Sequence, residues 1–296
     1  MHHLLLLLAL SACRPPCPEP ACPADSGRAC PTDTGEPCAP CDTGDTPDTA
    51  PPPRVAIYDD TAGPFASAWA PGLDAMEAAV LAAGYEPTRI GRDDLNDTPG
   101  LLHGFDALLF GGGYAYPGYT VHISAAGKAR IQEFVAAGGA FVGICAGAYF
   151  ACDSLAYEGA EFGDESGYDL DLYPGVCGGP VSEVSSYPTW APATLDFAGH
   201  EAYEGFAAAP FQRQLFYAGG PYFEAPPAGA EVLASYDDTG PHQGLAAVIA
   251  VPYGAGRVVL WGPHPEVLEV DEPSDVTMDA RNRELYARVV GWAASK

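Results

Sequence analysis

Residues 140–147 read Ala-Phe-Val-Gly-Ile-Cys-Ala-Gly, an apolar run that ends in a cysteine followed by small residues. Glycine at 143 and 147 allows a sharp strand-to-helix turn without a Cβ clash, and such a turn exposes the side chain at its centre. A helix that begins just after Cys145 would stabilise a thiolate through its dipole and its free N–H groups. The stretch therefore predicts that Cys145 is a nucleophile at the carboxyl end of a strand.

A second glycine-rich strand end lies upstream. Residues 107–110, Ala-Leu-Leu-Phe, predict a buried strand that ends in Gly111-Gly112-Gly113. We expect the Ala146 N–H to point at the oxyanion that forms when a thiolate attacks a carbonyl. Gly112 or Gly113 is expected to supply a second donor, because a residue without a side chain lets a substrate approach closely.

A thiol nucleophile needs a base within hydrogen-bond reach, and the base needs a carboxylate to orient it. His264-Pro265-Glu266 offers both, just after the apolar run at residues 257–261. The histidines at 103, 122, 200 and 242 precede a strand or lie in loop-like stretches. We therefore predict His264 as the base and Glu266 as the orienting acid.

Strand and helix patterns alternate around these motifs. Strands are expected at residues 55–58, 85–90, 107–110, 140–144 and 257–261, and helices at 73–83, 125–137 and 276–294. The strands are apolar throughout, which is typical of a parallel sheet covered on both faces. We predict an α/β fold, a flavodoxin-like three-layer sandwich with a mostly parallel central sheet and a Cys nucleophile elbow. Residues 214–218, 232–236 and 246–251 are expected to form antiparallel or edge strands.

Taken together, the motifs resemble the class I glutamine amidotransferase-like superfamily, in its branch named for the amino-terminal domain of biotin–protein ligases. The strings that carry the resemblance are Phe110-Gly-Gly-Gly-Tyr114, Gly143-Ile-Cys-Ala-Gly-Ala-Tyr-Phe150 and Gly219-Gly-Pro-Tyr-Phe223. It covers the chain from Arg54 to its end. The resemblance implies that Cys145, His264 and Glu266 match the superfamily's nucleophile, base and orienting acid.

One position departs from the superfamily pattern. Members that use glutamine usually carry Gln four residues after the nucleophile, where this chain has Tyr149. The sequence also shows neither a synthase domain that would receive ammonia nor a biotin-ligase catalytic domain. We therefore expect the triad chemistry to act on a substrate other than glutamine.

Two hypotheses for the function remain open. In the first, the chain is a thiol hydrolase or transferase that acts on an amide or related acyl bond of a small or peptide-like substrate, without a metal or cofactor. In the second, it is a non-catalytic ligand-binding or sensing module at the cell surface. Four tyrosines are expected to line the substrate pocket, with core packing as the alternative: Tyr114, Tyr149, Tyr217 and Tyr222.

The amino-terminal region predicts a location. The apolar run Leu4–Leu10 is too short to span a bilayer but suits a signal peptide, and Leu-Ser-Ala-Cys13 resembles a bacterial lipobox, although no Lys or Arg precedes it. The resemblance implies a signal at residues 1–12 and a lipid on Cys13, which would anchor the chain at the bacterial cell envelope, facing the periplasm or the exterior. Residues 13–53, rich in Pro, Asp, Thr and Cys, predict a disordered stalk before a single domain at residues 54–296.

The charge of the chain bears on its partners, and its cysteine content bears on the compartment in which it works. Thirteen Lys and Arg against 39 Asp and Glu give a formal net charge of −26, which disfavours binding to nucleic acid. Six of the nine cysteines lie at or before residue 41, which fits an oxidising compartment. Cys152 and Cys177 are free to pair with each other, but the sequence leaves their pairing open.

Overall fold

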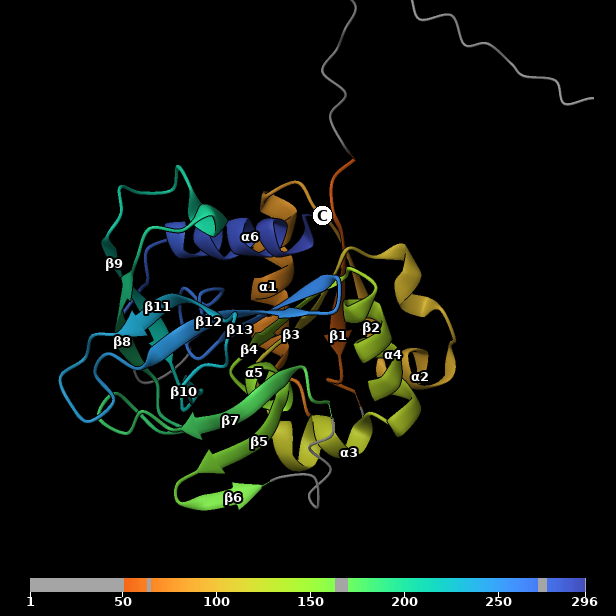
Figure 1. Cartoon of the computed structure of the whole chain (residues 1–296), viewed down its shortest axis with the longest axis horizontal. Coiled ribbons are helices and arrows are strands. Elements are labelled where there is room, and N and C mark those ends of the chain that lie inside the picture. Colours follow the sequence, from red (N-terminus) through yellow and green to blue (C-terminus); the bar gives the residue numbers. More distant parts are fainter. Residues whose placement is uncertain (1–50, 63–64, 163–169, 271–275, 296) are drawn as a thin grey trace, which may run out of the picture. The chain divides into compact units, whose positions relative to one another are not determined.

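The computed structural model describes residues 51–62, 65–162, 170–270 and 276–295 (Figure 1). The expected signal peptide, the lipid site at Cys13 and the stalk up to residue 50 lie outside these residues. Within the described part of the chain, no helix combines the length and the apolar character that a membrane span requires.

A parallel sheet forms the core of the domain, in the order β2-β1-β3-β4-β13. Its strands are β1 (Arg54–Asp59), β2 (Glu86–Gly91), β3 (Ala107–Phe110), β4 (Ala140–Ile144) and β13 (Gly256–Trp261). Every residue of β3 and β4 is buried, as the unbroken apolar runs predicted for strands covered on both faces. The predicted α/β fold with a mostly parallel sheet is confirmed.

Helices cover both faces of this sheet (Figure 1). They are α1 (Ala70–Ala82), α2 (Arg92–Asp97), α3 (Thr120–His122), α4 (Ala125–Ala136), α5 (Ala146–Phe150) and α6 (Arg281–Ala294). Figure 1 shows α1 and α6 side by side on one face, with α2 and α4 together on the other. Leu73, Met76 and Val80 of α1 are buried at helical spacing, so this helix packs its apolar stripe on the sheet.

The sheet continues beyond β13 with mixed pairings. The further strands are β5 (Cys152–Tyr157), β6 (Ala160–Phe162), β7 (Tyr173–Gly179), β8 (Ala191–Phe197), β9 (Phe211–Tyr217), β10 (Tyr222–Phe223), β11 (Glu231–Tyr236) and β12 (Ala246–Tyr253). β12 runs antiparallel to β13 and β11, and β9 runs antiparallel to β8, which confirms the expected antiparallel strands. The parallel pair β5 and β7 was not predicted.

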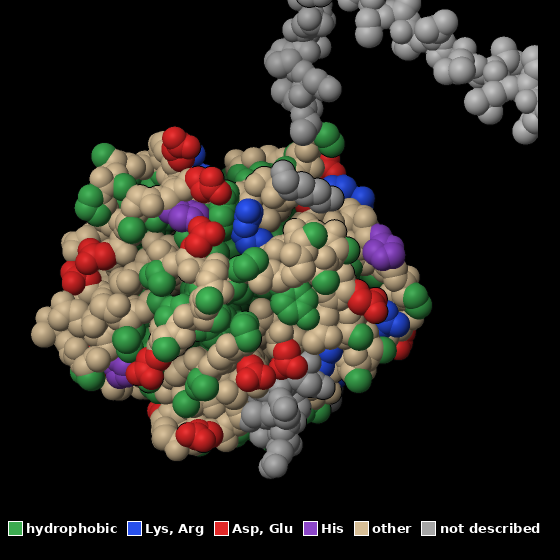
Figure 2. All heavy atoms as spheres, viewed as in Figure 1, with side chains coloured by type: hydrophobic (Ala, Val, Ile, Leu, Met, Phe, Trp, Pro, Cys, Tyr) green, Lys and Arg blue, Asp and Glu red, His purple; other side chains and the backbone are tan. Residues whose placement is uncertain are grey.

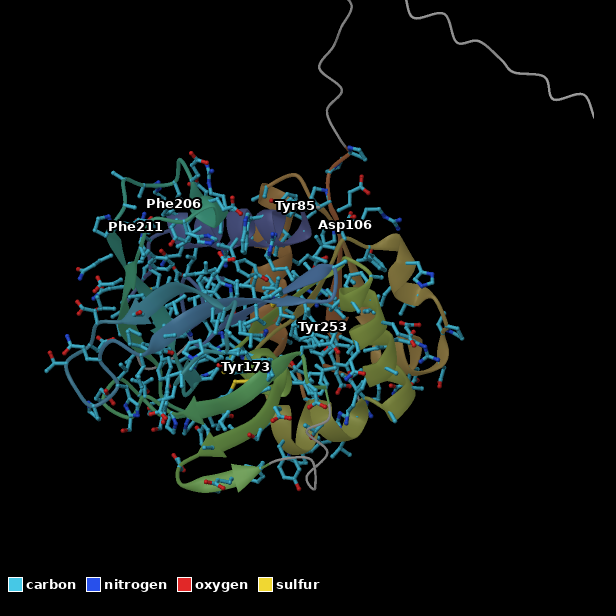
Figure 3. The ribbon with its side chains drawn as sticks, viewed as in Figure 1. Tyr85, Asp106, Tyr173, Phe206, Phe211 and Tyr253 are labelled. Carbon is cyan, nitrogen blue, oxygen red and sulfur yellow. A yellow bond between two sulfur atoms is a disulfide. The ribbon has the colours of Figure 1, made fainter. Side chains whose placement is uncertain are left out.

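A disulfide joins the two strands of that unpredicted pair. Cys152 in β5 and Cys177 in β7 are bonded, with their Cα atoms 6.0 Å apart, and both side chains are fully buried. Figure 3 shows the bond beside Tyr173, the residue that pairs with Cys152 across the two strands. The Cys152 sulfur also lies 3.1 Å from the Ala148 carbonyl oxygen, so the bond fastens these strands behind α5.

The last helix is shorter than predicted. It begins at Arg281 rather than at Val276, because the residues before it make other bonds. The Met278 N–H donates to the Leu268 carbonyl (2.8 Å), and an Asp279 carboxylate oxygen accepts from the Arg281 N–H (2.9 Å). The second bond satisfies a donor in the first turn of the helix, as a capping side chain does.

Candidate functional site

The turn between β4 and α5 holds Cys145 in an unusual backbone conformation, with φ at +51° and ψ at −107°. A non-glycine residue in this region costs about 1–3 kcal/mol, which the surrounding structure must supply. A Cβ added at Gly143 would lie 2.5 Å from the Gly147 carbonyl oxygen, and one added at Gly147 would lie 2.4 Å from that of Phe110. Backbone atoms therefore require both glycines, and the turn places Cys145 at the wall of a cavity.

His264 reaches the same cavity because β13 lies parallel to β4. The register pairs Trp261 with Ile144, and the Trp261 carbonyl accepts the Cys145 N–H (2.9 Å). The chain then turns, and the His264 N–H donates to the Phe216 carbonyl at 2.7 Å. Two strand ends that are far apart in sequence are thus adjacent, as expected for the carboxyl edge of a parallel sheet.

The imidazole of His264 lies between two acidic groups. Its Nδ1 is 2.8 Å from Glu266 Oε1, and the ring lines the same cavity as Cys145, whose charge acts on it. Burial acts to lower the pKa of His264, but the negative charges of Glu266 and Cys145 outweigh it and raise the pKa to about 10. At neutral pH the ring is therefore an imidazolium, with the Glu266 carboxylate as its hydrogen-bond partner.

The buried negative charge of Glu266 is compensated mainly by the His264 ring. The residue is fully buried, and its second oxygen, Oε2, has no hydrogen-bond partner among the described residues. A buried carboxylate is strongly unfavourable unless it is paired. The contact with His264 is therefore the main one that stabilises the charge of Glu266.

Two tryptophans enclose the imidazole. The Trp190 ring centre is 4.9 Å from that of His264, and the Trp69 ring stands edge-on to it at 6.0 Å. The His264 side chain is only 2% exposed, so these rings help to shield it from water. Neither tryptophan was predicted as part of the site. Trp69 lies in the segment that follows β1. Because ligand sites lie beyond the carboxyl ends of parallel strands, that rule is the signal that would have found it.

The glycine-rich end of β3 divides into two environments. Gly113 lines the cavity together with Ala146, whereas Gly112 is not part of the lining and lies against His264. Gly113, with φ at +143°, pairs with Ala68 in an isolated antiparallel bridge. The bonds of that bridge are made by its neighbours, from Tyr114 N–H to Ser67 O (2.8 Å) and from Trp69 N–H to Gly112 O (2.9 Å). The Gly113 N–H takes no part in them.

The cavity has a volume of about 540 Å³ and a largely aromatic wall. Its aromatic lining residues are Trp69, Tyr114, Tyr116, Tyr149, Tyr157, Phe162, Tyr187 and Trp190. The wall includes two of the four predicted tyrosines, Tyr114 and Tyr149. Among the described residues, no group of three or more His, Cys, Asp or Glu side chains is arranged to hold a metal ion.

The other two tyrosines predicted for the pocket are not in the lining. Tyr217 is fully buried, where its hydroxyl accepts the Val181 N–H at 2.5 Å and donates to the Gly220 carbonyl at 2.7 Å. Tyr222 packs against His242, with ring centres 4.6 Å apart. Neither side chain is among the described residues that line the cavity, so the structure does not support their assignment to the pocket.

A buried acid supports the cavity wall from behind. Asp60, at the carboxyl end of β1, is only 4% exposed. Its carboxylate accepts hydrogen bonds from Ser67 Oγ and from Arg92 (Nη2 at 2.6 Å), and lies 2.6 Å from His122 Nδ1. Its backbone carbonyl accepts the N–H groups of Ser67 and Ala68. We name Asp60, Ser67, Arg92 and His122 the Asp60 cluster; it holds the segment that carries Trp69.

Gly112→Ala provides a direct test of the His264 position. A Cβ at this glycine would lie 2.6 Å from His264 Cε1, so the ring must move although the backbone is unstrained. We expect alkylation of Cys145 at pH 6 to slow about tenfold, with a stability loss of about 1–3 kcal/mol from overpacking. Gly199→Ala is the control, because its added Cβ meets only ordinary contact at 3.5 Å. Equal alkylation rates in the two variants would contradict the prediction.

The chain is similar in sequence to a known protein family and to two individual proteins. The family model described as biotin–protein ligase, N terminal, matches residues 56–290. The chain is 28% identical over 183 residues to the biotin–protein ligase of Schizosaccharomyces pombe (strain 972 / ATCC 24843), which covers 60% of this chain and 28% of that protein. It is 34% identical over 166 residues to an uncharacterized protein of Chlamydia muridarum (strain MoPn / Nigg), covering 54% of this chain and 60% of that one. The chain thus spans less than two thirds of the length of either relative.

Among solved structures, PurLQS from Thermotoga maritima superposes with a TM-score of 0.53 and 16% sequence identity, covering 81% of this chain and 99% of that chain. At this identity the likeness shows the fold alone, which is the class I glutamine amidotransferase-like fold. The family model, by contrast, spans most of the folded domain. The chain belongs to the family of biotin–protein ligase N-terminal domains.

Proposed function

We propose that the chain is a thiol-dependent hydrolase or transferase that acts on an amide or related acyl bond. The observation that carries the proposal is Cys145 on a strained turn at the wall of a cavity that His264 also lines, with His264 held by Glu266. Nucleophile, base and orienting acid in this order are the parts that acyl transfer by a thiol requires.

The first half of the reaction forms a thioester. The Cys145 thiolate attacks the carbonyl carbon of the substrate, a C–S bond forms, and the carbonyl electron pair moves to oxygen. The N–H groups of Ala146 and Gly113, both at the cavity wall, stabilise that oxyanion. His264, whose Nδ1 is bonded to Glu266, gives the proton on Nε2 to the leaving nitrogen as the C–N bond breaks.

The second half returns the enzyme to its starting state. The neutral imidazole takes a proton from water, or from another nucleophile in a transfer, which attacks the thioester carbonyl. The C–S bond breaks and the thiolate leaves, again paired with the imidazolium. Because Glu266 holds Nδ1 throughout, the ring keeps the same orientation in both halves.

Tyr149 supports a substrate other than glutamine. It occupies the position where glutamine-using members of the superfamily carry Gln, and it is nearly buried in the floor of the cavity. Its hydroxyl donates to the Gly219 carbonyl at 3.0 Å and is therefore already engaged. The side chain offers the substrate a ring in place of a free amide.

A non-catalytic binding module is the second candidate function. Its support is the exposed aromatic surface at the cavity mouth, where Tyr114, Tyr116 and Tyr187 are each more than 40% exposed. We also propose that the protein works outside the cytoplasm, as the lipobox-like sequence implies. The buried Cys152–Cys177 disulfide supports this location, because such bonds persist in oxidising compartments.

Acyl transfer to Cys145 tests the proposal. The purified chain is mixed with p-nitrophenyl acetate, and release of p-nitrophenol is followed together with the intact mass. We expect a burst of one equivalent and a mass gain of one acetyl group, located on Cys145 by peptide mapping. Cys145→Ala should lose both signals, and hydroxylamine should remove the acetyl group from the unaltered chain. A panel of amides, with the same variant as control, then separates turnover from binding alone.

Two outcomes would overturn the proposal. One is an unaltered chain that shows no burst although it is folded by circular dichroism. The other is a burst that persists in Cys145→Ala. Binding of an amide without cleavage, combined with no burst, would favour the binding module.

A further inference from the structure

We infer that the cavity beside Cys145 selects an uncharged amide with a flat, apolar substituent on its nitrogen, such as an N-arylalkyl amide, over a free amino acid. The inference rests on the proposed function and names the substrate class for the same site. It derives from the described residues of the wall and the rim of the cavity, which are mostly aromatic and aliphatic.

Within the part of the chain that the structure describes, the wall carries no formal charge apart from the reacting pair. Besides Cys145 and His264, the described lining residues are aromatic, aliphatic, proline or glycine, with no Asp, Glu, Lys or Arg. A free amino acid brings an ammonium and a carboxylate, and each loses water when it enters such a cavity. Burying a charge without a partner is strongly unfavourable, so the wall discriminates against ionic substrates.

The hydroxyl groups of the wall are largely engaged with the protein. Tyr149 donates to the Gly219 carbonyl, and the hydroxyls of Tyr114 and Tyr187 lie 3.0 Å apart in a shared hydrogen bond. The Tyr157 ring stands edge-on to that of Tyr149, with centres 5.9 Å apart. These residues therefore present ring faces and edges to the cavity, which suits planar apolar groups.

Exposed rings extend this wall to the surface. Tyr187 is 57% exposed and meets Tyr114 with ring centres 6.0 Å apart, and Phe65 follows at 6.2 Å from Tyr114. On another side of the mouth, Tyr116 packs on Phe162 at 5.1 Å. We name these five residues the aromatic rim. Large aromatic side chains are rarely left exposed together unless they contact a ligand or partner.

The net charge of the chain also acts on a charged ligand, apart from the residues of the cavity. Figure 2 shows Asp and Glu scattered over the face in view, with only a few Lys and Arg. With a net charge of −26, the long-range field attracts cations and repels anions. A test therefore needs a neutral, an anionic and a cationic probe, so that the field is separated from the cavity.

Three chloroacetamides with the same reactive group provide that test. They are N-benzylchloroacetamide, N-chloroacetylglycine and N-(2-aminoethyl)chloroacetamide, with chloroacetamide as the small reference. Alkylation of Cys145 is measured for each at pH 7 by peptide-resolved mass spectrometry and divided by the rate with glutathione. We expect the benzyl probe to exceed both charged probes by at least 30-fold, and to exceed chloroacetamide itself.

Variants locate the preference at the aromatic rim. Tyr187→Ala should lower the ratio of benzyl to chloroacetamide rates at least fivefold. Val232→Ala, an exposed position in β11 outside the cavity, should leave that ratio unchanged. Because both side chains are more than 40% exposed, neither change removes a core contact.

The outcomes separate this inference from the proposed function. In one outcome, chloroacetamide reacts much faster with Cys145 than with glutathione while all probes share one normalised rate. That result overturns the substrate class and leaves the proposed function standing. A cationic probe that exceeds the benzyl probe would also overturn the class, in favour of selection by the field. If chloroacetamide labels Cys145 no faster than glutathione, the activated thiol is absent and both proposals fail.

Discussion

Replacing His264 with alanine is expected to slow alkylation of Cys145 by iodoacetamide at pH 6 by about 100-fold. In the unaltered chain burial acts to lower the pKa of His264, but the charges of Glu266 and Cys145 raise it to about 10, so an imidazolium is present at pH 6 to stabilise a thiolate. A cysteine thiol without a neighbouring cation is only about 0.3% ionised at pH 6. The rate of the variant should then rise about tenfold per pH unit up to pH 8, whereas the unaltered chain should change little.

The same substitution should also destabilise the fold, by about 3–5 kcal/mol, because it leaves the buried Glu266 carboxylate without its cation. A group whose pKa is raised on folding stabilises the native state fully below its unfolded pKa, about 6.5, and loses that contribution as the pH rises through the folded value. For His264 the stabilisation is therefore complete at pH 6 and disappears around pH 10. Urea unfolding of the two proteins at pH 6, 8 and 10 should show the gap between them narrowing.

If His264→Ala does not fold, Glu266→Gln tests the same effect of His264 on Cys145 in a variant that keeps the hydrogen bond to Nδ1. It removes the charge that raises the pKa of His264 while retaining an oxygen that accepts from Nδ1. The pKa of His264 should fall, and the pH at which Cys145 loses its low-pH reactivity should shift with it. His103→Ala, at an exposed histidine remote from the cavity, is the control. A His264→Ala variant that is alkylated as fast as the unaltered chain at pH 6 would refute the ion pair.

Most of the parallel half of the sheet was predictable because β1, β3, β4 and β13 contain buried apolar runs, whereas β2 at the edge is partly exposed. β3 and β4 are fully buried, so their sequences contain no alternation that a half-exposed strand would show. β5 and β7 escaped prediction for the opposite reason. Asp153 and Pro174 are exposed in them, and the Cys152–Cys177 bond that joins them is not specified by sequence spacing alone.

The candidate site divides in a similar way. Cys145, His264 and Glu266 were predicted from local motifs and strand ends, and the structure brings their side chains together. Their catalytic role stays a proposal. Trp190 was missed because it lies on a loop between β7 and β8, and its contact with His264 depends on tertiary packing alone. Tyr217 was assigned to the pocket from its residue type, whereas its side chain is fully buried and its hydroxyl bonds Val181 and Gly220.

Replacing Asp60 with alanine is expected to lower the free energy of unfolding by about 3 kcal/mol. The substitution removes the acceptor for the buried Ser67 hydroxyl and for Arg92, and the neighbour of His122. Unsatisfied buried polar groups are costly, whereas the half-exposed Arg92 regains water and contributes less. Asp59→Ala is the matched control, because that carboxylate is more exposed, and its loss should cost about 1 kcal/mol.

The effect of Asp60 should depend on pH with the opposite sign to that of His264. Burial alone would raise the pKa of Asp60, but hydrogen bonds from Ser67, His122 and Arg92 outweigh it and hold the pKa below its usual value. A depressed pKa gives stability that is present above the unfolded value, near 4, and is lost as the pH falls through the folded one. The gap in unfolding free energy between Asp60→Ala and the unaltered chain should therefore be full at pH 7 and shrink below pH 4.

The Asp60 cluster also positions the cavity wall, and this role has a separate readout. Ser67 and Ala68 donate their N–H groups to the Asp60 carbonyl, and the Ser67 carbonyl accepts the Tyr114 N–H beside Gly113. If this segment shifts, Trp69 withdraws from His264 and the Gly113 backbone moves. We expect Cys145 in folded Asp60→Ala to be alkylated about tenfold more slowly at pH 6, well below its melting temperature. An unchanged rate per folded molecule would assign Asp60 to stability alone, since only positioning alters the reactivity of a thiol on a different strand.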